Sequence, residues 1–457
     1  MASLNKTGRF LHPDLINGKI FTSLLAFAMP ILISFVFLQL YNAVDTIIVG
    51  HYLKESSLAA VGSSAVLFEL IVGFGNGFGS GMSIVVARAY GANKQEYLKK
   101  LVAASVLLTL AVTFALILLS AAFLKKSLIL LGTPENLLEE SFSYIVVISM
   151  GCGVLFAYNL LSGLLRAIGN SFVPLVFLIF SSLLNIVLDI ILITRFNLGI
   201  KGAAIATVIA QLVSAVLCLA YIFLHARILI PQAKHFSLKS LEFQHFKELM
   251  GQGFSMAFMG SIVSSGTVVL QSAINSFGTL IIAAHIATRK LFCIITIPII
   301  SFAISASTFV SQNYGAGRLD RAKKGVKMAS LITIVWTFFL ASTMFFFVTP
   351  AIRFISGSSL SEIVSYGRNY IYFSVPFMTA LGPLVVIRTC MQGLGSKILP
   401  LVSSIIELCG KILFTALVIP HLGIWGIIIC EPLIWCAMFM HLAYAYCKTI
   451  RQLESKI

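Results

Sequence analysis

The amino-acid sequence predicts an all-α integral membrane protein of twelve transmembrane helices, arranged as two halves of six. Two observations predict this fold class. Hydrophobic residues form 59% of the 457 positions and charged residues only 11%, which is too little polar surface to cover a soluble globule of this length. In addition, residues 90–100 (YGANKQEYLKK) recur as residues 314–324 (YGAGRLDRAKK), 224 positions later, so one membrane module is present twice.

Two shorter repeats follow in the same order. Residues 199–202 (GIKG) return as residues 423–426 (GIWG), and residues 166–169 (RAIG) return as residues 392–395 (QGLG). Because all three pairs keep the order of the chain, the two halves are expected to share one topology. Repeated bundles of this kind commonly hold a binding site between them and rock against each other.

Each transmembrane element is justified by an apolar stretch of roughly 20 residues, which as a helix crosses a bilayer core of about 30 Å. In chain order the stretches are residues 24–50, 57–88, 101–124, 144–166, 172–194, 202–225, 250–277, 281–312, 328–350, 366–388, 399–419 and 426–446. Alternating glycines in residues 73–81 favour close packing of the second helix. Residues 227–248 are amphipathic and predict a cytoplasmic linker. The predicted domains are therefore residues 1–226 and 249–457, joined by this linker.

The formal charge of +16 is typical of nucleic-acid-binding proteins, but the positive-inside rule explains it better. With the N-terminus inside, most of the 32 Lys and Arg residues fall on the inner side of the membrane. We therefore expect a multi-pass protein of the cell membrane with both termini cytoplasmic and no nucleic-acid partner. Most of the eight cysteines lie within apolar stretches without metal-type spacing, which indicates small core residues.

Five acidic residues fall within the apolar stretches: Asp45, Glu69, Asp189, Glu407 and Glu431. An ionisable group at membrane depth costs several kcal/mol, so each one marks an ion path, a proton relay or a paired structural charge. Glu69 has no obvious partner in the sequence. It is interpreted either as a residue of a cavity or lateral gate, or as a protonated acid with local hydrogen bonds.

Asp45 and Asp189 lie at similar depths in the first and fifth stretches. Asn185 precedes Asp189 by one helical turn on the same face, and Thr207 reaches a similar level in the sixth stretch. Oxygen ligands of this kind suit a small hard cation, and two close carboxylates also favour a proton. The alternative is that Asp45 caps a helix end and Asp189 only hydrogen-bonds Asn185.

Pro30 precedes Asp45 by 15 positions in the first stretch. Proline removes a helical hydrogen bond and permits a kink. We therefore hypothesise that titration of Asp45 changes the bend of the first helix near Pro30.

The second half does not repeat the acid pair. The repeat places Val269 or Gln271 opposite Asp45, and Thr415 opposite Asp189. The charged residues within its helices are instead Arg289, Lys290, Glu407, Lys411 and Glu431. They are interpreted as a structural ion network. The alternative is a substrate-contacting group, in which the excess of one cation would favour an anionic or zwitterionic cargo.

Together these features resemble the multidrug and toxic compound extrusion (MATE) family. The resemblance rests on the halves of six stretches, Pro30 followed by residues 42–50 (NAVDTIIVG), the repeated YGA loop and residues 185–189 (NIVLD). It implies two six-helix bundles related by a pseudo-twofold axis along the membrane normal. It also implies a V-shaped cavity and export driven by proton or sodium antiport.

In its first half the sequence is most similar to the DNA-damage-inducible F-type branch of that family. The resemblance implies a cation site, for H⁺ or Na⁺, formed by Asp45, Asn185, Asp189 and Thr207, with the carbonyl of Ala203 as a further ligand. Another branch couples through acids in the seventh and tenth helices. Neither of those predicted stretches contains Asp or Glu here, so we expect coupling in the first half.

The function predicted from the sequence is a secondary antiporter that exports small amphiphilic compounds in exchange for H⁺ or Na⁺. It is expected to need no cofactor, to act as a monomer in the bilayer, and to bind a small-molecule substrate. Its candidate cavity residues are Gln39, Tyr41, Asn42, Glu69, Asn159, Met256, Gln271, Arg289 and Lys411.

Two alternatives remain open. A flippase or exporter for an anionic lipid-linked compound is favoured by Arg289, Lys290 and Lys411. A membrane-embedded transferase is disfavoured, because the eight histidines are scattered without metal spacing and no nucleophile-elbow motif occurs.

Overall fold

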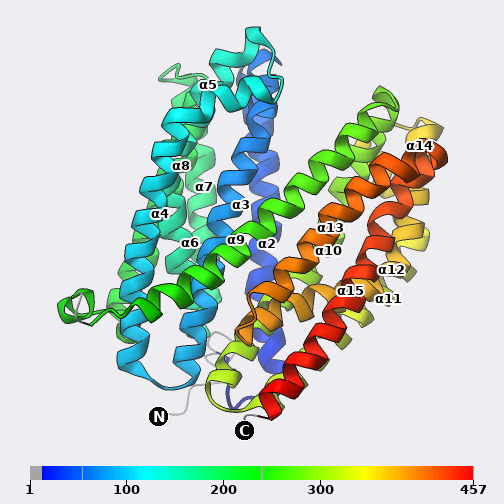
Figure 1. The fold of residues 1–457 in the computed structure, drawn as a ribbon. Coiled ribbons are helices and arrows are strands. Elements are labelled where there is room, and N and C mark those ends of the chain that lie inside the picture. Colours follow the sequence, from blue (N-terminus) through cyan, green and yellow to red (C-terminus); the bar gives the residue numbers. More distant parts are fainter. Residues whose placement is uncertain (1–12, 54, 238–239, 456–457) are drawn as a thin grey trace. The chain divides into compact units, whose positions relative to one another are not determined.

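The computed structural model describes residues 13–53, 55–237 and 240–455 of the chain. The first half contains the helices α2 (Ile20–Tyr52), α3 (Glu55–Gly91), α4 (Gln95–Leu130), α5 (Glu135–Met150), α6 (Cys152–Ala167), α7 (Phe172–Thr194) and α8 (Ile200–His225) (Figure 1). The second half contains α9 (Phe243–Asn275), α10 (Thr279–Gly315), α11 (Leu319–Ser356), α12 (Ser361–Gly393), α13 (Ile398–Leu413), α14 (Ile419–Leu422) and α15 (Ile424–Glu454). Short 3₁₀ turns lie at Arg227–Leu229 and Ala233–Phe236, and a π-helical turn lies at Phe414–Val418. The described residues form no strand.

The prediction of an all-α protein with twelve membrane helices is confirmed. Among the described residues, eleven helices are long and apolar enough to cross a membrane, and the bent pair α5 and α6 makes twelve when counted as one span. This pair corresponds to the fourth predicted stretch and bends by 44°. The break lies at Gly151, where an added Cβ would come within 2.5 Å of the Val208 side chain, so the close contact with α8 requires glycine.

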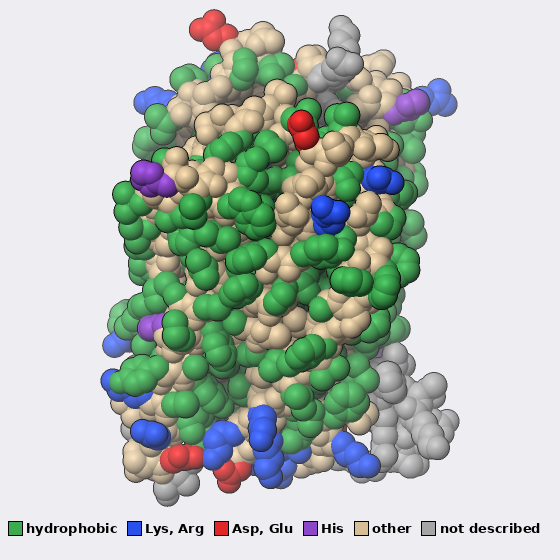
Figure 2. All heavy atoms as spheres, turned by 90° about the vertical axis from the view of Figure 1, so that its right-hand side faces the viewer, with side chains coloured by type: hydrophobic (Ala, Val, Ile, Leu, Met, Phe, Trp, Pro, Cys, Tyr) green, Lys and Arg blue, Asp and Glu red, His purple; other side chains and the backbone are tan. Residues whose placement is uncertain are grey.

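The helices extend beyond the predicted stretches at their polar ends. Consequently Glu248 falls in the second turn of α9 and Glu362 in the first turn of α12, outside the apolar part of each helix. Figure 2 shows the pattern on one face of the molecule: hydrophobic side chains cover its middle, and Lys and Arg side chains gather towards one end. This distribution is typical of a chain that crosses a bilayer.

The chain divides into two compact units, and two of the boundaries between them lie inside helices. One unit contains Met29–Gly260, and the other contains Leu15–Ala28 together with the residues from Ser261 onward. The division predicted from the sequence placed the boundary in the linker instead, at residues 227–248. The difference arises because the beginning of α2 and the first half of α9 each belong to the compact unit formed by the other half of the repeat.

In the first unit, the glycines of α3 allow α9 to pack closely. A Cβ at Gly77 would lie 2.7 Å from the carbonyl oxygen of Met256, and a Cβ at Gly81 would lie 2.5 Å from that of Gln252. Backbones can approach this closely only at residues without a side chain. The first half of α9 is thereby held in the core cluster that includes Phe78, Leu249 and Ala257.

The linker is held by polar contacts with the first copy of the repeated loop. His235 Nε2 lies 2.9 Å from Glu96 Oε2. Glu248 accepts hydrogen bonds from Arg88 at 3.0 Å and from the Tyr97 hydroxyl at 2.8 Å. These contacts hold the linker and the beginning of α9 against the adjoining ends of α3 and α4.

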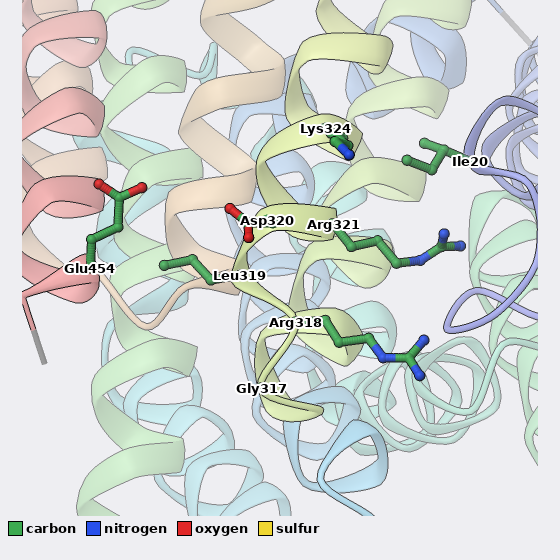
Figure 3. Close-up of a pocket in the computed structure, with 8 residues that line it drawn as sticks. All are labelled: Ile20, Gly317, Arg318, Leu319, Asp320, Arg321, Lys324 and Glu454. Carbon is green, nitrogen blue, oxygen red and sulfur yellow. The ribbon is translucent and has the colours of Figure 1, made fainter. Parts of the chain in front are cut away.

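The second copy of the loop holds the segment that leads into α2. Arg318 donates to the Ile16 carbonyl at 2.8 Å and to Asn17 Oδ1 at 2.9 Å, and Arg321 donates to the carbonyls of Leu15, at 3.4 Å, and Gly18. Beside these arginines is a surface pocket of about 540 Å³ (Figure 3). Each copy of the loop therefore anchors the segment that leads into a long helix, α9 in the first unit and α2 in the second.

Candidate functional site

The first-half acid site, which we define as Asp45, Asn185, Asp189 and Thr207, draws its side chains from α2, α7 and α8. On α7 the buried polar residues Asn185 and Asp189 follow one another at the spacing of one turn. A small apolar cluster of Ile48, Val49, Ile193 and Ala203 packs these three helices together next to the acids. The polar side chains are thus positioned by hydrophobic contacts that lie one helical turn from them along each helix.

The two carboxyl groups come together. The side chains of Asp45 and Asp189 lie close enough to share a hydrogen bond. Asp189 is fully buried, and one oxygen of each carboxyl group is buried without a hydrogen-bond partner among the described residues. Two ionised carboxylates at this separation repel each other in a low dielectric, so the arrangement favours a proton or a small cation between them. Asp45 also lies within α2 and is not a capping residue.

The amide of Asn185 links Asp189 to Thr207. In the amide orientation that satisfies both groups, its nitrogen donates to Asp189 Oδ2 at 2.8 Å and its oxygen accepts from the Thr207 backbone N–H at 3.0 Å. Thr207 Oγ1 donates to the Ala203 carbonyl at 3.1 Å. The Ala203 carbonyl, predicted as an ion ligand, is therefore engaged by Thr207 in this structure.

Two tyrosines lie beside the acids. The Tyr41 hydroxyl is 3.2 Å from Thr207 Oγ1, and the buried Tyr144 of α5 lies near enough to both Asp45 and Asp189 to interact with their charge. Tyr41 is one of the predicted cavity residues, whereas the sequence analysis missed Tyr144. The one signal that could have found it is the tyrosine at the corresponding repeat position, Tyr370.

This constellation can hold a proton or a sodium ion. Its donors are two carboxylates, an amide oxygen and hydroxyl groups, which are the hard oxygen ligands that such cations take. Because the site carries up to two negative charges, the binding of a cation is also the simplest way to relieve the repulsion between them.

The remaining predicted cavity residues have varied environments. Gln39, Asn42 and Glu69 are exposed side chains of α2 and α3, and Met256 is half-buried on α9. The Asn159 side chain is buried, with its amide nitrogen unpaired among the described residues. Gln271 donates to Asn275 at 2.9 Å. Pro30 lies inside α2, two residues beyond the point where this helix passes from one compact unit to the other.

The second-half ion network, which we define as Arg289, Tyr370, Glu407, Lys411 and Glu431, is a second group of charged side chains within the membrane helices. Arg289 and the Tyr370 hydroxyl both donate to Glu431 Oε2, at 2.6 and 2.8 Å. Lys411 Nζ lies 3.4 Å from Glu431 Oε1 and 3.0 Å from Glu407 Oε1. The network therefore contains two cations and two acids, so its charges balance.

Lys290 is not part of this network. Its side chain is exposed on α10, while that of the adjacent Arg289 points to Glu431. The expected excess of one positive charge is therefore absent from the network, because successive residues of a helix point in different directions. The network therefore gives no charge-based reason to expect an anionic cargo.

Both copies of the module match the MatE family model, over residues 30–191 and again over residues 255–417. The chain belongs to the MatE family. Members of this family, here written MATE, are membrane transporters, so the protein is a multi-pass membrane transporter and not an enzyme.

Relatives agree with this membership. The chain is 26% identical to the probable multidrug resistance protein YoeA of Bacillus subtilis (strain 168), over 89% of this chain and 90% of that protein. It is 22% identical to the multidrug export protein MepA of Staphylococcus aureus (strain NCTC 8325), over 92% of each. A crystal structure of a mutant of the Vibrio cholerae MATE transporter VcmN superimposes with a TM-score of 0.87 at 22% identity, over 95% of this chain and 97% of that one. This likeness shows that the MATE fold is shared.

Proposed function

We propose that this MATE transporter is a secondary active antiporter that exports small amphiphilic organic compounds in exchange for H⁺ or Na⁺. The observation that carries the proposal is the close approach of Asp45 and Asp189 inside the first unit. The printed names of YoeA and MepA, a probable multidrug resistance protein and a multidrug export protein, support export of compounds of this kind.

The coupling follows from the charge of the first-half acid site. A cation that enters from outside neutralises the carboxyl pair and favours the conformation that releases cargo. Its departure to the inside restores the repulsion and favours the opposite conformation. Such coupling requires that the two conformations bind the cation with different affinity, since equal affinity shifts no equilibrium.

The assignment to the F-type branch belongs to the same proposal. It is supported by the clustering of Asp45, Asn185, Asp189 and Thr207. It is also supported by α9 and α12, whose acids Glu248 and Glu362 lie near the start of each helix and outside its apolar part. We further propose that both termini are cytoplasmic, as the charge distribution along the chain predicts, and that the functional unit is a monomer.

The test is gradient-driven transport in proteoliposomes, with pH and sodium gradients imposed separately against a panel of cationic and anionic amphiphiles. We expect Asp45→Asn and Asp189→Asn each to reduce gradient-driven export to the rate of protein-free liposomes. Glu135→Gln provides a control, because Glu135 is an exposed acid in the first turn of α5, outside the first-half acid site and the candidate cavity residues. Export at the normal rate by either aspartate variant would refute coupling at this site.

A further inference from the structure

The two halves can be aligned residue by residue, because the structure repeats its special backbone positions. Gly169 and Gly395 both have a positive φ, of 92° and 94°, and lie 226 positions apart. Gly199 and Gly423 have φ values of 58° and 57° and lie 224 positions apart. Helices α7 and α13 begin 226 positions apart, whereas α8 and α15 begin 224 positions apart. Helices α5 and α12 also begin 226 positions apart. The shift is therefore 226 for α5 and α7, and 224 for α8.

With these shifts, the residues around the first-half acid site correspond to members of the second-half ion network. Tyr144 corresponds to Tyr370, and Thr207 corresponds to Glu431. Both tyrosines interact with buried carboxylates: Tyr144 lies near Asp45 and Asp189, and Tyr370 donates directly to Glu431.

Two further pairs of corresponding residues lie on α7 and on the segment that α13 begins. Asn185 of α7 corresponds to Lys411 of α13, and Asp189 corresponds to Thr415. Where the first half has an amide beside an acid, the second half has an ammonium group beside a hydroxyl. Thr415 lies in the π-helical turn that follows α13, a distortion frequently found at functional sites. Its hydroxyl is buried without a hydrogen-bond partner among the described residues.

We propose that the Lys411 ammonium group is a tethered counter-ion, which fills the second half's copy of the ion site and leaves it no exchangeable cation. This inference rests on the proposed function in one respect: it assumes that the first-half acid site is the site that exchanges its cation. A latent site for a monovalent cation lies between Glu407 and Glu431, and removal of Lys411 Nζ opens it.

The contacts of Lys411 resemble those of a bound ion. Its side chain is 2% exposed. Its three N–H donors face three oxygens: Glu407 Oε1 at 3.0 Å, Thr267 Oγ1 at 3.3 Å and Glu431 Oε1 at 3.4 Å. Carboxylate and hydroxyl oxygens of this kind also bind small monovalent cations.

Charge balance explains why the tether has to be a cation. Arg289 compensates one acid through Glu431 Oε2, so without Lys411 the network holds two acids and one cation. A buried charge left uncompensated is strongly destabilising. A free cation in the vacated volume restores the balance, as the bound cation does in the first half.

The test compares Lys411→Met with its parent in a chain that also carries Asp45→Asn and Asp189→Asn, so that the first-half site does not respond. Melting temperatures of the purified protein in detergent are measured at fixed pH and ionic strength, with sodium or ammonium chloride replacing choline chloride. Choline is too large for the space left by one ammonium group. We expect a saturable rise of several degrees for Lys411→Met and none for the parent, because a ligand that binds only the folded state stabilises it.

The matched control adds Glu407→Gln to Lys411→Met, which leaves Arg289 and Glu431 as a balanced pair. This variant is expected to fold well and to show no response to either salt. The proposal is overturned if Lys411→Met is insensitive to both salts, or if the control responds equally.

A second measurement needs no change at Lys411. Equilibrium dialysis with radiolabelled sodium is performed on the chain that carries only Asp45→Asn and Asp189→Asn. The absence of bound sodium supports the proposal, and any remaining saturable binding overturns it. Failure of the first-half variants to alter transport would count against the proposed function alone, so the two proposals fail separately.

Discussion

The hydroxyl of Tyr41 lies 3.2 Å from Thr207 Oγ1, and this contact joins α2 to α8 at the first-half acid site. Asp45 follows Tyr41 by one helical turn on the same face of α2. The hydrogen bond therefore fixes the depth and rotation of the helix segment that presents Asp45 to Asp189.

Replacing Tyr41 by Phe should weaken binding of the coupling cation. The variant loses one hydrogen bond, which contributes about 0.5–1.5 kcal/mol, so the affinity is expected to fall about two- to tenfold. The measurement is a titration of the cation against transport rate and against the melting temperature. Tyr52→Phe, at the exposed end of the same helix, serves as the control. An affinity equal to that of the wild type would show that the contact does not position Asp45.

The corresponding tyrosines of the two halves should have different roles. Tyr144→Phe is expected to lower cation affinity, because its phenol lies near both carboxyl groups of the first-half acid site. Tyr370→Phe removes a hydrogen bond from the buried Glu431 and should lower the free energy of unfolding by about 1–3 kcal/mol. Its cation affinity should stay at the wild-type value. Cation titrations and denaturation of both variants check this, and identical profiles would contradict it.

Arg289→Met should destabilise the second unit strongly. The change leaves Glu431 buried with only Lys411, which it shares with Glu407, as its cationic partner, and loss of one member of a buried ion pair costs about 3–5 kcal/mol. Adding Glu431→Gln should recover much of that loss, because the network then keeps one cation and one acid. Denaturation of the single and double variants in detergent measures both effects. A double variant less stable than Arg289→Met would show that charge balance does not govern this network.

The meeting of Asp45 with Asp189 was predictable because depth along a membrane helix can be counted from the sequence and because helical periodicity places Asn185 beside Asp189. The contact of Lys411 with Glu407 was predictable for the same reason, since the two residues are one turn apart. Tyr144 was missed because the helix that carries it breaks at Gly151. Counting residues gives neither the depth nor the direction of a side chain across such a break.

Packing between distant helices could not be predicted in the same way. The sequence groups Arg289 with Lys290, but only the position of α15 decides which of the two faces Glu431. Likewise, the polar linker looks like the natural boundary between two domains. The first half of α9 nevertheless packs with the first unit, because the α3 glycines allow close contact with its backbone.

That last contact gives the sharpest stability prediction. A Cβ at Gly81 would lie 2.5 Å from the carbonyl oxygen of Gln252, and the rigid backbone there cannot move aside easily. Gly81→Ala should therefore lower the free energy of unfolding by about 1–3 kcal/mol, the usual cost of overpacking. Gly62→Ala is the matched control on the same helix, since nothing lies within 4 Å of its Cβ position. It should stabilise the protein by up to about 1 kcal/mol through helix propensity. Thermal denaturation of both variants measures the difference, and equal melting temperatures would show that α3 and α9 do not pack through Gly81.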